Sequence, residues 1–161
     1  TPTALDWRET DIYLLKSNGI WRWVPEKNGL LFCELADLRS ETFFAAPHLK
    51  VAPVHIVYVS NRPRTETLIS RLGEGVVEKL RHSAWTPEKL EEMRTRSMII
   101  DVGAKIQAVY MAAAAMDLSC VARTGFDAHH VERILRLQKG ESVVAIQTLG
   151  YRPNSILDAI K

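Results

Sequence analysis

The stretch that decides the fold is DVGAKIQAVYMAAAA, residues 101–115. Alanine fills residues 112–115, so a neighbouring helix can approach this segment closely. Upstream, Thr86-Pro87-Glu88 predicts the start of a helical region, because it supplies a hydroxyl cap, a first-turn proline and an acid against the dipole. We expect two helical pieces after that start. In the second piece the apolar residues recur at helical spacing, as Val102, Ile106, Val109, Tyr110, Ala113 and Met116.

Strand-like sequences flank this helical region. Residues 51–59 are apolar without alternation, which predicts a central strand covered on both faces, with Pro53 at its start. Residues 11–15 predict another strand, and residues 19–24 and 30–33 predict a hairpin. The remaining expectations are a short helix over 36–44, loop and irregular helix over 61–82, a strand over 118–122, a helix capped by Asp127 and a last strand over 142–149. This order predicts an α+β sandwich with a mixed sheet.

Composition favours one soluble globular domain, since the 161 residues are 47% hydrophobic and 25% charged. The net charge of +2 gives no reason to expect nucleic acid or an anionic membrane as partner. No stretch approaches the roughly 18 uninterrupted apolar residues of a membrane-spanning helix. Cys33 and Cys120 each lie in an apolar run, so we expect buried thiols rather than a disulfide or a metal site. This pattern favours a reducing compartment, and we expect a cytoplasmic protein.

Four passages follow one another in a characteristic order. They are residues 3–13, residues 19–23 with 35–39, residues 52–59, and residues 101–114 followed by 123–127 and 149–153. Their order and spacing resemble the nitroreductase-like family of FMN-dependent oxidoreductases, particularly the branch of the thiazole and oxazole peptide dehydrogenases. The resemblance implies a mixed, mainly antiparallel central sheet flanked by helices, in a homodimer.

The resemblance also implies the chemistry. Two FMN molecules would lie at the subunit interface, each touched by both chains, with residues 103–116 near the centre of the dimer contact. The backbone N–H near Gly125 would approach flavin N5, because a glycine at that turn lets the main chain come close. NAD(P)H would reduce FMN and then give way to a small electron-poor acceptor, a quinone or nitro compound. No catalytic side chain is implied; the implied cofactor-binding positions are Asp6, Arg8, Gln107, Thr124, Gly125, Arg152 and Lys161.

Two departures from the family pattern keep other functions open. Asp6 and Arg8 stand where the family usually carries Asn and Gln, and a carboxylate cannot reproduce the paired donor and acceptor of an amide. The family's N-terminal helix and its Arg-rich phosphate loop would precede Thr1, so residues 1–161 are expected to form a single domain without them. One alternative is a dimeric protein that has lost turnover, either with bound flavin or without it. The other is a peptide-azoline oxidase.

Other polar residues favour structural roles. His129 and His130 are adjacent and therefore on different helix faces, which suits a helix surface better than a metal site. His55 is expected in the core or at an edge, because no ligand-type residue lies at metal-site spacing from it. Arg62, Arg64 and Arg71 could attract the phosphate of a nicotinamide dinucleotide, yet such a loop is more often solvated.

Overall fold

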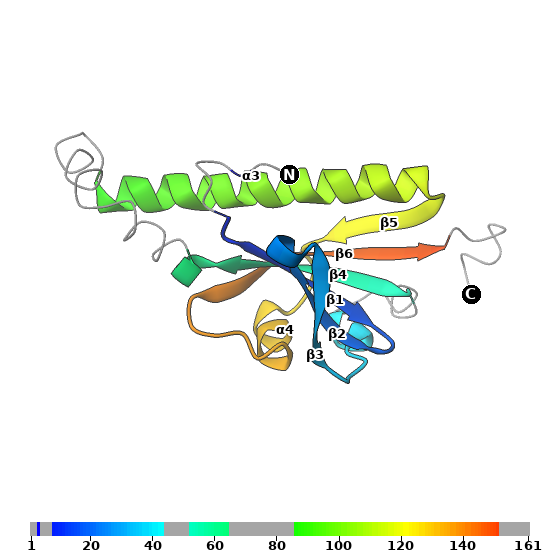
Figure 1. Cartoon of the computed structure of the whole chain (residues 1–161). Coiled ribbons are helices and arrows are strands. Elements are labelled where there is room, and N and C mark those ends of the chain that lie inside the picture. Colours follow the sequence, from blue (N-terminus) through cyan, green and yellow to red (C-terminus); the bar gives the residue numbers. More distant parts are fainter. Residues whose placement is uncertain (1–2, 4–7, 44–51, 65–85, 152–161) are drawn as a thin grey trace.

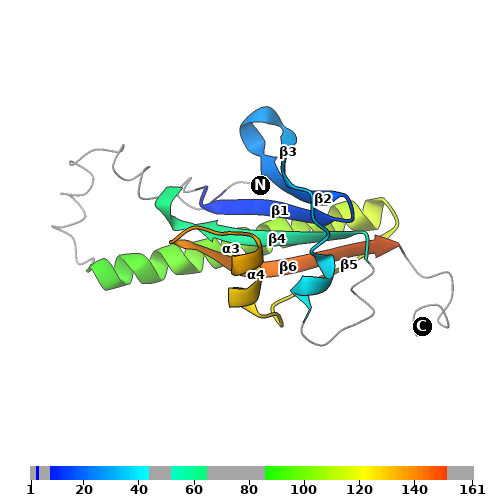
Figure 2. The same ribbon diagram turned by 90° about the horizontal axis from the view of Figure 1, so that it is seen from below.

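A computed structural model of the chain describes residues 3, 8–43, 52–64 and 86–151. A central sheet has the long helix α3 (Pro87–Ala115) on one face and the short helix α4 (Ala128–Ile134) on the other (Figure 1, Figure 2). The strands are β1 (Thr10–Lys16), β2 (Gly19–Val24), β3 (Gly29–Glu34), β4 (Val54–Asn61), β5 (Leu118–Arg123) and β6 (Glu141–Tyr151), with 3-10 turns η2 (Pro25–Lys27) and η3 (Arg39–Thr42).

The strand order in the sheet is β3-β2-β1-β4-β6-β5, and every described pairing is antiparallel. The predicted α+β fold with a mainly antiparallel sheet is confirmed. β1 and β6 run in the same direction, while β4 and β5 run in the opposite one. Arg123, the last residue of β5, pairs with Ile146, which pairs with Val57 and so aligns with Tyr13 of β1. The end of β5 is therefore level with the middle of β1, and β6 ends on the side where β5 begins.

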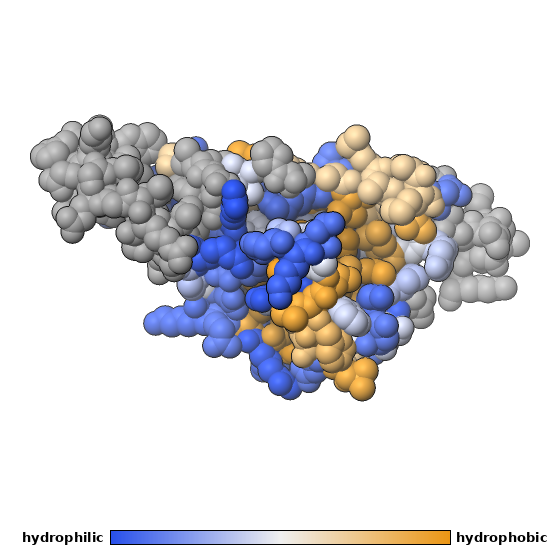
Figure 3. Space-filling model, viewed as in Figure 1, coloured by the Kyte–Doolittle hydropathy of each residue, from blue (hydrophilic) through white to orange (hydrophobic). Residues whose placement is uncertain are grey.

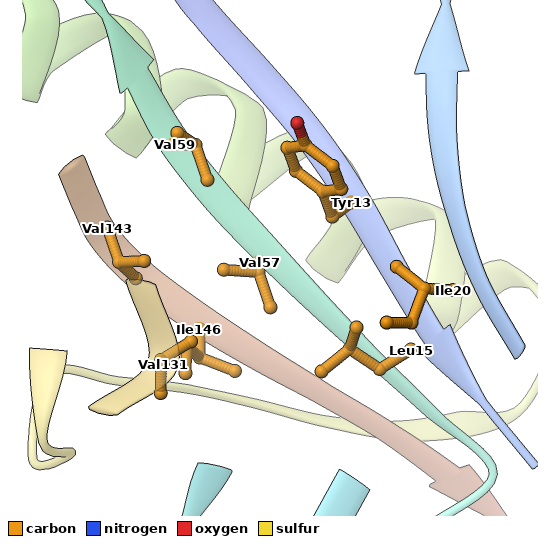
Figure 4. Packing of buried hydrophobic residues seen from close by; sticks show 8 residues of the cluster. All are labelled: Tyr13, Leu15, Ile20, Val57, Val59, Val131, Val143 and Ile146. Carbon is orange, nitrogen blue, oxygen red and sulfur yellow. The ribbon is translucent and has the colours of Figure 1, made fainter. Parts of the chain in front are cut away.

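The core forms on both faces of β4, as the unbroken apolar run predicted. Its residues Ile56–Val59 are 8% exposed or less and alternate between the two helical layers. Side chains that are almost fully buried stabilise the fold by about 1.5–3 kcal/mol each. Ile56 and Tyr58 pack with Met98 and Val102 of α3. Figure 4 shows the cluster on the α4 side, made of Tyr13, Leu15, Ile20, Val57, Val59, Val131, Val143 and Ile146.

Helix α3 is one continuous helix of 29 residues, so the expectation of two pieces was wrong. The predicted cap is confirmed: the Thr86 hydroxyl accepts from the Lys89 amide at 3.3 Å. Met116, the last of the apolar residues at helical spacing, is the C-cap of the helix and is 60% exposed. Within the described residues, the segment Glu91–Ala115 of α3 is long and apolar enough to span a membrane, by length and composition alone. In this fold, 22% of the apolar stretch of that segment is buried.

Two further expectations needed correction. The short helix predicted over 36–44 is only the four-residue turn η3, which lies beside α4, and residue 44 is outside the described residues. Cys33 was expected to be a buried thiol but is exposed, because β3 is an edge strand. Leu30, Leu31 and Phe32 of the same strand are also 44–48% exposed, and Figure 3 shows hydrophobic surface over this hairpin. Most of the segment predicted as loop and irregular helix, residues 65–82, lies outside the described residues.

Candidate functional site

The exposed turn Thr124-Gly125 follows β5 and leads into α4. Nothing lies within 4 Å of the position that a Gly125 β-carbon would occupy, so the main chain is open there to close approach. Among the described residues, no hydrogen-bond acceptor faces the Gly125 N–H. After the turn, the Phe126 N–H donates to the Thr124 carbonyl at 3.1 Å, and Asp127 caps α4 through the His130 N–H at 3.0 Å. The turn thus offers an open main-chain donor between two fixed elements.

Arg8 and the Thr124-Gly125 turn lie apart in the sheet. Arg8 precedes the start of β1, whereas β5 ends level with Tyr13 in the middle of β1, and the order β1-β4-β6-β5 adds three strand spacings, roughly 14 Å, across the sheet. The Arg8 backbone has a positive φ of 48°, and its carbonyl accepts from Arg64 Nη1 at 3.1 Å. This separation suits two points of contact along one extended ligand better than one shared contact atom.

Gln107 projects from the exposed side of α3. The helix is fixed to β5 close by, because the Ala122 N–H donates to the Tyr110 hydroxyl at 2.6 Å. No contact of Gln107 with Thr124 or Gly125 occurs among the described interactions. Asp6, Arg152 and Lys161 lie outside the described residues; Tyr151, the last residue of β6, is at the sheet end opposite to Gly125. Of the seven predicted positions, Arg8, Gln107, Thr124 and Gly125 are among the described residues, and the described contacts bring only the adjacent Thr124 and Gly125 together.

Arg123 is the residue beside this turn that the sequence interpretation left without a role. Its guanidinium donates to the Thr42 carbonyl, to the Thr42 hydroxyl at 2.7 Å and to the Thr148 hydroxyl at 3.3 Å. Burial lowers the pKa of Arg123 to about 10, so the group remains charged at neutral pH. The available signal was an arginine that ends an otherwise apolar strand directly before a Thr-Gly turn.

Behind the turn, a buried polar network joins α3 to the sheet. The Tyr58 hydroxyl donates to Gln147 Oε1 at 2.6 Å, and Gln147 Nε2 donates to the Ile106 carbonyl at 3.2 Å and to Cys120 Sγ at 3.0 Å. Burial raises the pKa of both Tyr58 and Cys120, so both stay protonated at neutral pH. Burial also lowers the pKa of Lys105 on α3, against the opposing charge of Asp101. The network of Tyr58, Gln147 and Cys120 supports the structure and contains no ionised side chain.

The remaining candidates have structural surroundings. His55 is fully buried and its Nδ1 lies 3.0 Å from the Thr42 hydroxyl, as expected for a core histidine. His129 is fully exposed on α4, as predicted, and no group of metal-binding side chains occurs within the described residues. Arg62 pairs with Glu91, and Arg64 pairs with Asp11 at 2.6 Å, so neither is simply solvated. Arg71 lies outside the described residues.

Comparisons with known proteins agree on one family. The family model described as "Nitroreductase family" matches residues 2–151. No curated protein sequence matches the chain. Among solved structures, a Ralstonia eutropha JMP134 protein with a provisional assignment as a nitroreductase is 22% identical, with a TM-score of 0.73 over 96% of this chain and 63% of that one.

Two other structures share the fold. A provisionally assigned nitroreductase from Anabaena variabilis is 18% identical, with a TM-score of 0.70 over 92% of this chain and 28% of that chain. A chain of the E. coli microcin synthetase McbBCD complex with truncated pro-MccB17 is 10% identical, with a TM-score of 0.67 over 95% of this chain and 55% of that chain. The chain therefore spans less than two thirds of the length of each of these three structures.

Proposed function

The chain belongs to the nitroreductase family, and from this membership we propose that it is an FMN-dependent oxidoreductase. In this proposal, hydride passes from NAD(P)H through flavin to a small electron-poor acceptor such as a nitro compound or a quinone. The observation that carries the proposal is the exposed Thr124-Gly125 turn, with its open main-chain N–H and the empty space beside Gly125.

The residues present fit a flavin edge at this turn. Bound FMN would supply the ring that accepts and releases hydride. The Gly125 N–H would donate a hydrogen bond to that ring, and the absence of a β-carbon would allow the ring to lie against the main chain. A main-chain donor needs no titrating group. Thr124, Gln107 and Arg8 would contribute polar contacts at the ring and its periphery.

A homodimer would complete this site. Helix α3 exposes Ile99 at 55%, Ile100 at 68% and Met111 at 66%, and the same helix exposes Gly103, Ala104, Ala108 and Ala112. Small residues along a helix let a second helix approach closely, and large apolar side chains at the margins add buried area. We therefore propose that α3 packs against α3 of a second copy, which would bring each turn near residues of the partner chain.

The dimer is tested by one substitution in the middle of α3. Ala108→Glu should convert a species of twice the chain mass into a monomer in light scattering coupled to size exclusion. Ser142→Glu, at an exposed position at the start of β6, is the matched control and should leave the dimer intact. A protein that is monomeric before substitution, or an Ala108→Glu variant that stays dimeric, would contradict this interface.

The second candidate function is a dimeric protein without flavin turnover, favoured by Arg8. Its carbonyl is held by Arg64, and its side chain is a cation where the family usually has an amide. A third is a peptide-azoline oxidase, in line with the family branch that the sequence resembles. All three are separated by the flavin content of the purified protein, measured from its spectrum and from the flavin released on heating, together with turnover assays.

Near one FMN per chain, followed by NAD(P)H oxidation that depends on a quinone or nitro compound, supports the first candidate. Flavin with turnover only on azoline peptides supports the third, and a colourless protein that excess FMN does not reconstitute supports the second. Gly125→Val sharpens the test, because a side chain there has open space in the protein itself and should weaken FMN binding without unfolding it. Gly29→Ala, with only one contact at 3.5 Å, is the control.

A further inference from the structure

The side chain of Arg123 joins three separate segments of the chain. It starts from the last residue of β5, bonds to Thr148 on β6 and bonds twice to Thr42 at the end of η3. The Phe43 ring lies over the guanidinium, with 3.9 Å between the central carbon and the ring centroid. Thr42 and Thr148 are 1% and 3% exposed, so both acceptors are fixed in the core.

The Thr42 hydroxyl is itself fully engaged. It donates to the Arg39 carbonyl at 2.9 Å, which leaves its oxygen to accept from Arg123 and to meet His55 Nδ1 at 3.0 Å. His55 in turn packs edge-on against Phe43, with ring centroids 5.2 Å apart. The guanidinium therefore binds a rigid, buried set of partners rather than a mobile surface loop.

The position of Arg123 connects this rigid set to the candidate site. Thr124 and Gly125 are exposed, and the next anchored residue after them is Phe126, which packs against the α4-side cluster. The two-residue turn is thus fixed at one end by the Arg123 side chain and at the other by Phe126. Loss of the guanidinium contacts would release one of the two supports of the Gly125 N–H.

Among the described residues, no carboxylate pairs with Arg123. Its hydrogen-bond partners are a carbonyl and two hydroxyls, and none of the ion pairs in the described part of the chain includes it. A half-buried positive charge therefore lies two residues from Gly125. Positive charge in such a low-dielectric setting stabilises nearby negative charge, and reduced flavin is more negative than oxidised flavin.

We propose that Arg123 is a positioning residue for the flavin edge: its clamp on Thr42 and Thr148 holds the Gly125 N–H, and its charge favours the reduced flavin. The proposal rests on the proposed flavin function. It assigns no direct contact between Arg123 and the flavin. The hydrogen-bond clamp and the effect of the charge can be tested separately. The clamp needs the forked geometry of the arginine side chain, whereas the charge effect needs only a cation.

The test compares Arg123→Lys, Arg123→Met and the control Arg136→Met. Arg136 is 77% exposed and paired with Glu34, so the control removes the same charge at a surface position. Three quantities are measured: FMN affinity by titration, the midpoint potential of bound FMN, and hydrogen exchange of residues 119–127 without flavin. Arg123→Met should weaken FMN binding about tenfold or more, lower the potential and speed exchange at the turn.

Arg123→Lys distinguishes the clamp from the charge. It should weaken FMN binding and speed exchange as Arg123→Met does, because an ammonium cannot reach both threonines in the same geometry. It should keep a potential near that of the wild type. Should Arg123→Met fail to fold, the affinity and exchange of Arg123→Lys decide the clamp.

Two results overturn the proposal. One is that the Arg123 variants match Arg136→Met, with FMN affinity and exchange rates within twofold and the same midpoint potential. That result would overturn the role of Arg123 and leave the flavin function intact. A wild-type protein that binds no FMN would overturn the flavin function and this proposal together.

Discussion

The ion pair between Arg94 of α3 and Glu9 is the most deeply buried one within the described residues, and its loss should be the costliest. The side chains are 10% and 2% exposed, and Arg94 Nε lies 2.9 Å from Glu9 Oε2. Arg94 Nη2 also donates to the Arg62 carbonyl at 2.8 Å. Arg94→Met keeps an unbranched apolar stem but removes the cation from beside a buried carboxylate. Breaking a buried pair in this way costs about 3–5 kcal/mol.

Arg96→Met is the matched control, since Arg96 lies on the same helix and also pairs with a glutamate. That pair, with Glu92, is four residues apart and 74% and 60% exposed, so its removal should cost only about 0.3–0.5 kcal/mol. Urea unfolding followed by circular dichroism, at one protein concentration, gives the two changes in the free energy of unfolding. Equal losses for the two variants, or a loss under about 1 kcal/mol for Arg94→Met, would refute the argument from burial.

Three further substitutions or modifications follow from single contacts. Tyr58→Phe leaves Gln147 without its donor at 2.6 Å, so the free energy of unfolding should fall by about 1–3 kcal/mol in the same urea assay. Gly19→Ala should cost about 1–3 kcal/mol, because φ is +131° and the new β-carbon would meet a backbone oxygen at 2.6 Å; a neutral result would contradict the turn geometry. A thiol reagent should modify exposed Cys33 before Cys120, whose raised pKa delays its thiolate until higher pH, as mass spectrometry can follow.

The sequence predicted the fold where local patterns and burial coincide. The run Val54–Val59 is apolar at nearly every position, and only a central strand covered on both faces buries all of it. The failures have tertiary causes. Cys33 has the same apolar neighbours as a buried thiol, but β3 is an edge strand, and strand order is not encoded in a local pattern. Helix α3 continues through Gly103 because Val102 and Ile106 on the adjacent face pack against the sheet.

The sequence predicted where the candidate site lies along the chain, but not how its residues are arranged in space. The Thr124-Gly125 turn follows directly from the order of the strand and the capped helix. Its position relative to Arg8 depends on the order β1-β4-β6-β5, which joins strands far apart in sequence. The clamp on Thr42 was equally hidden, because residues 81 positions apart meet only in the folded chain.

Arg94 and Arg123 show that arginine can have two different electrostatic roles in one fold. Arg94 faces a carboxylate, so the pair is electrically neutral and its field cancels at a distance. Within the described part of the chain, Arg123 contacts hydroxyls, a carbonyl and an aromatic ring, which hold the guanidinium without cancelling its charge. Desolvating a cation without a counter-ion lowers stability, and the lowered pKa of Arg123, about 10, reflects that cost. Negative charge near Gly125 would offset part of this cost, and a flavin reduced there would provide it.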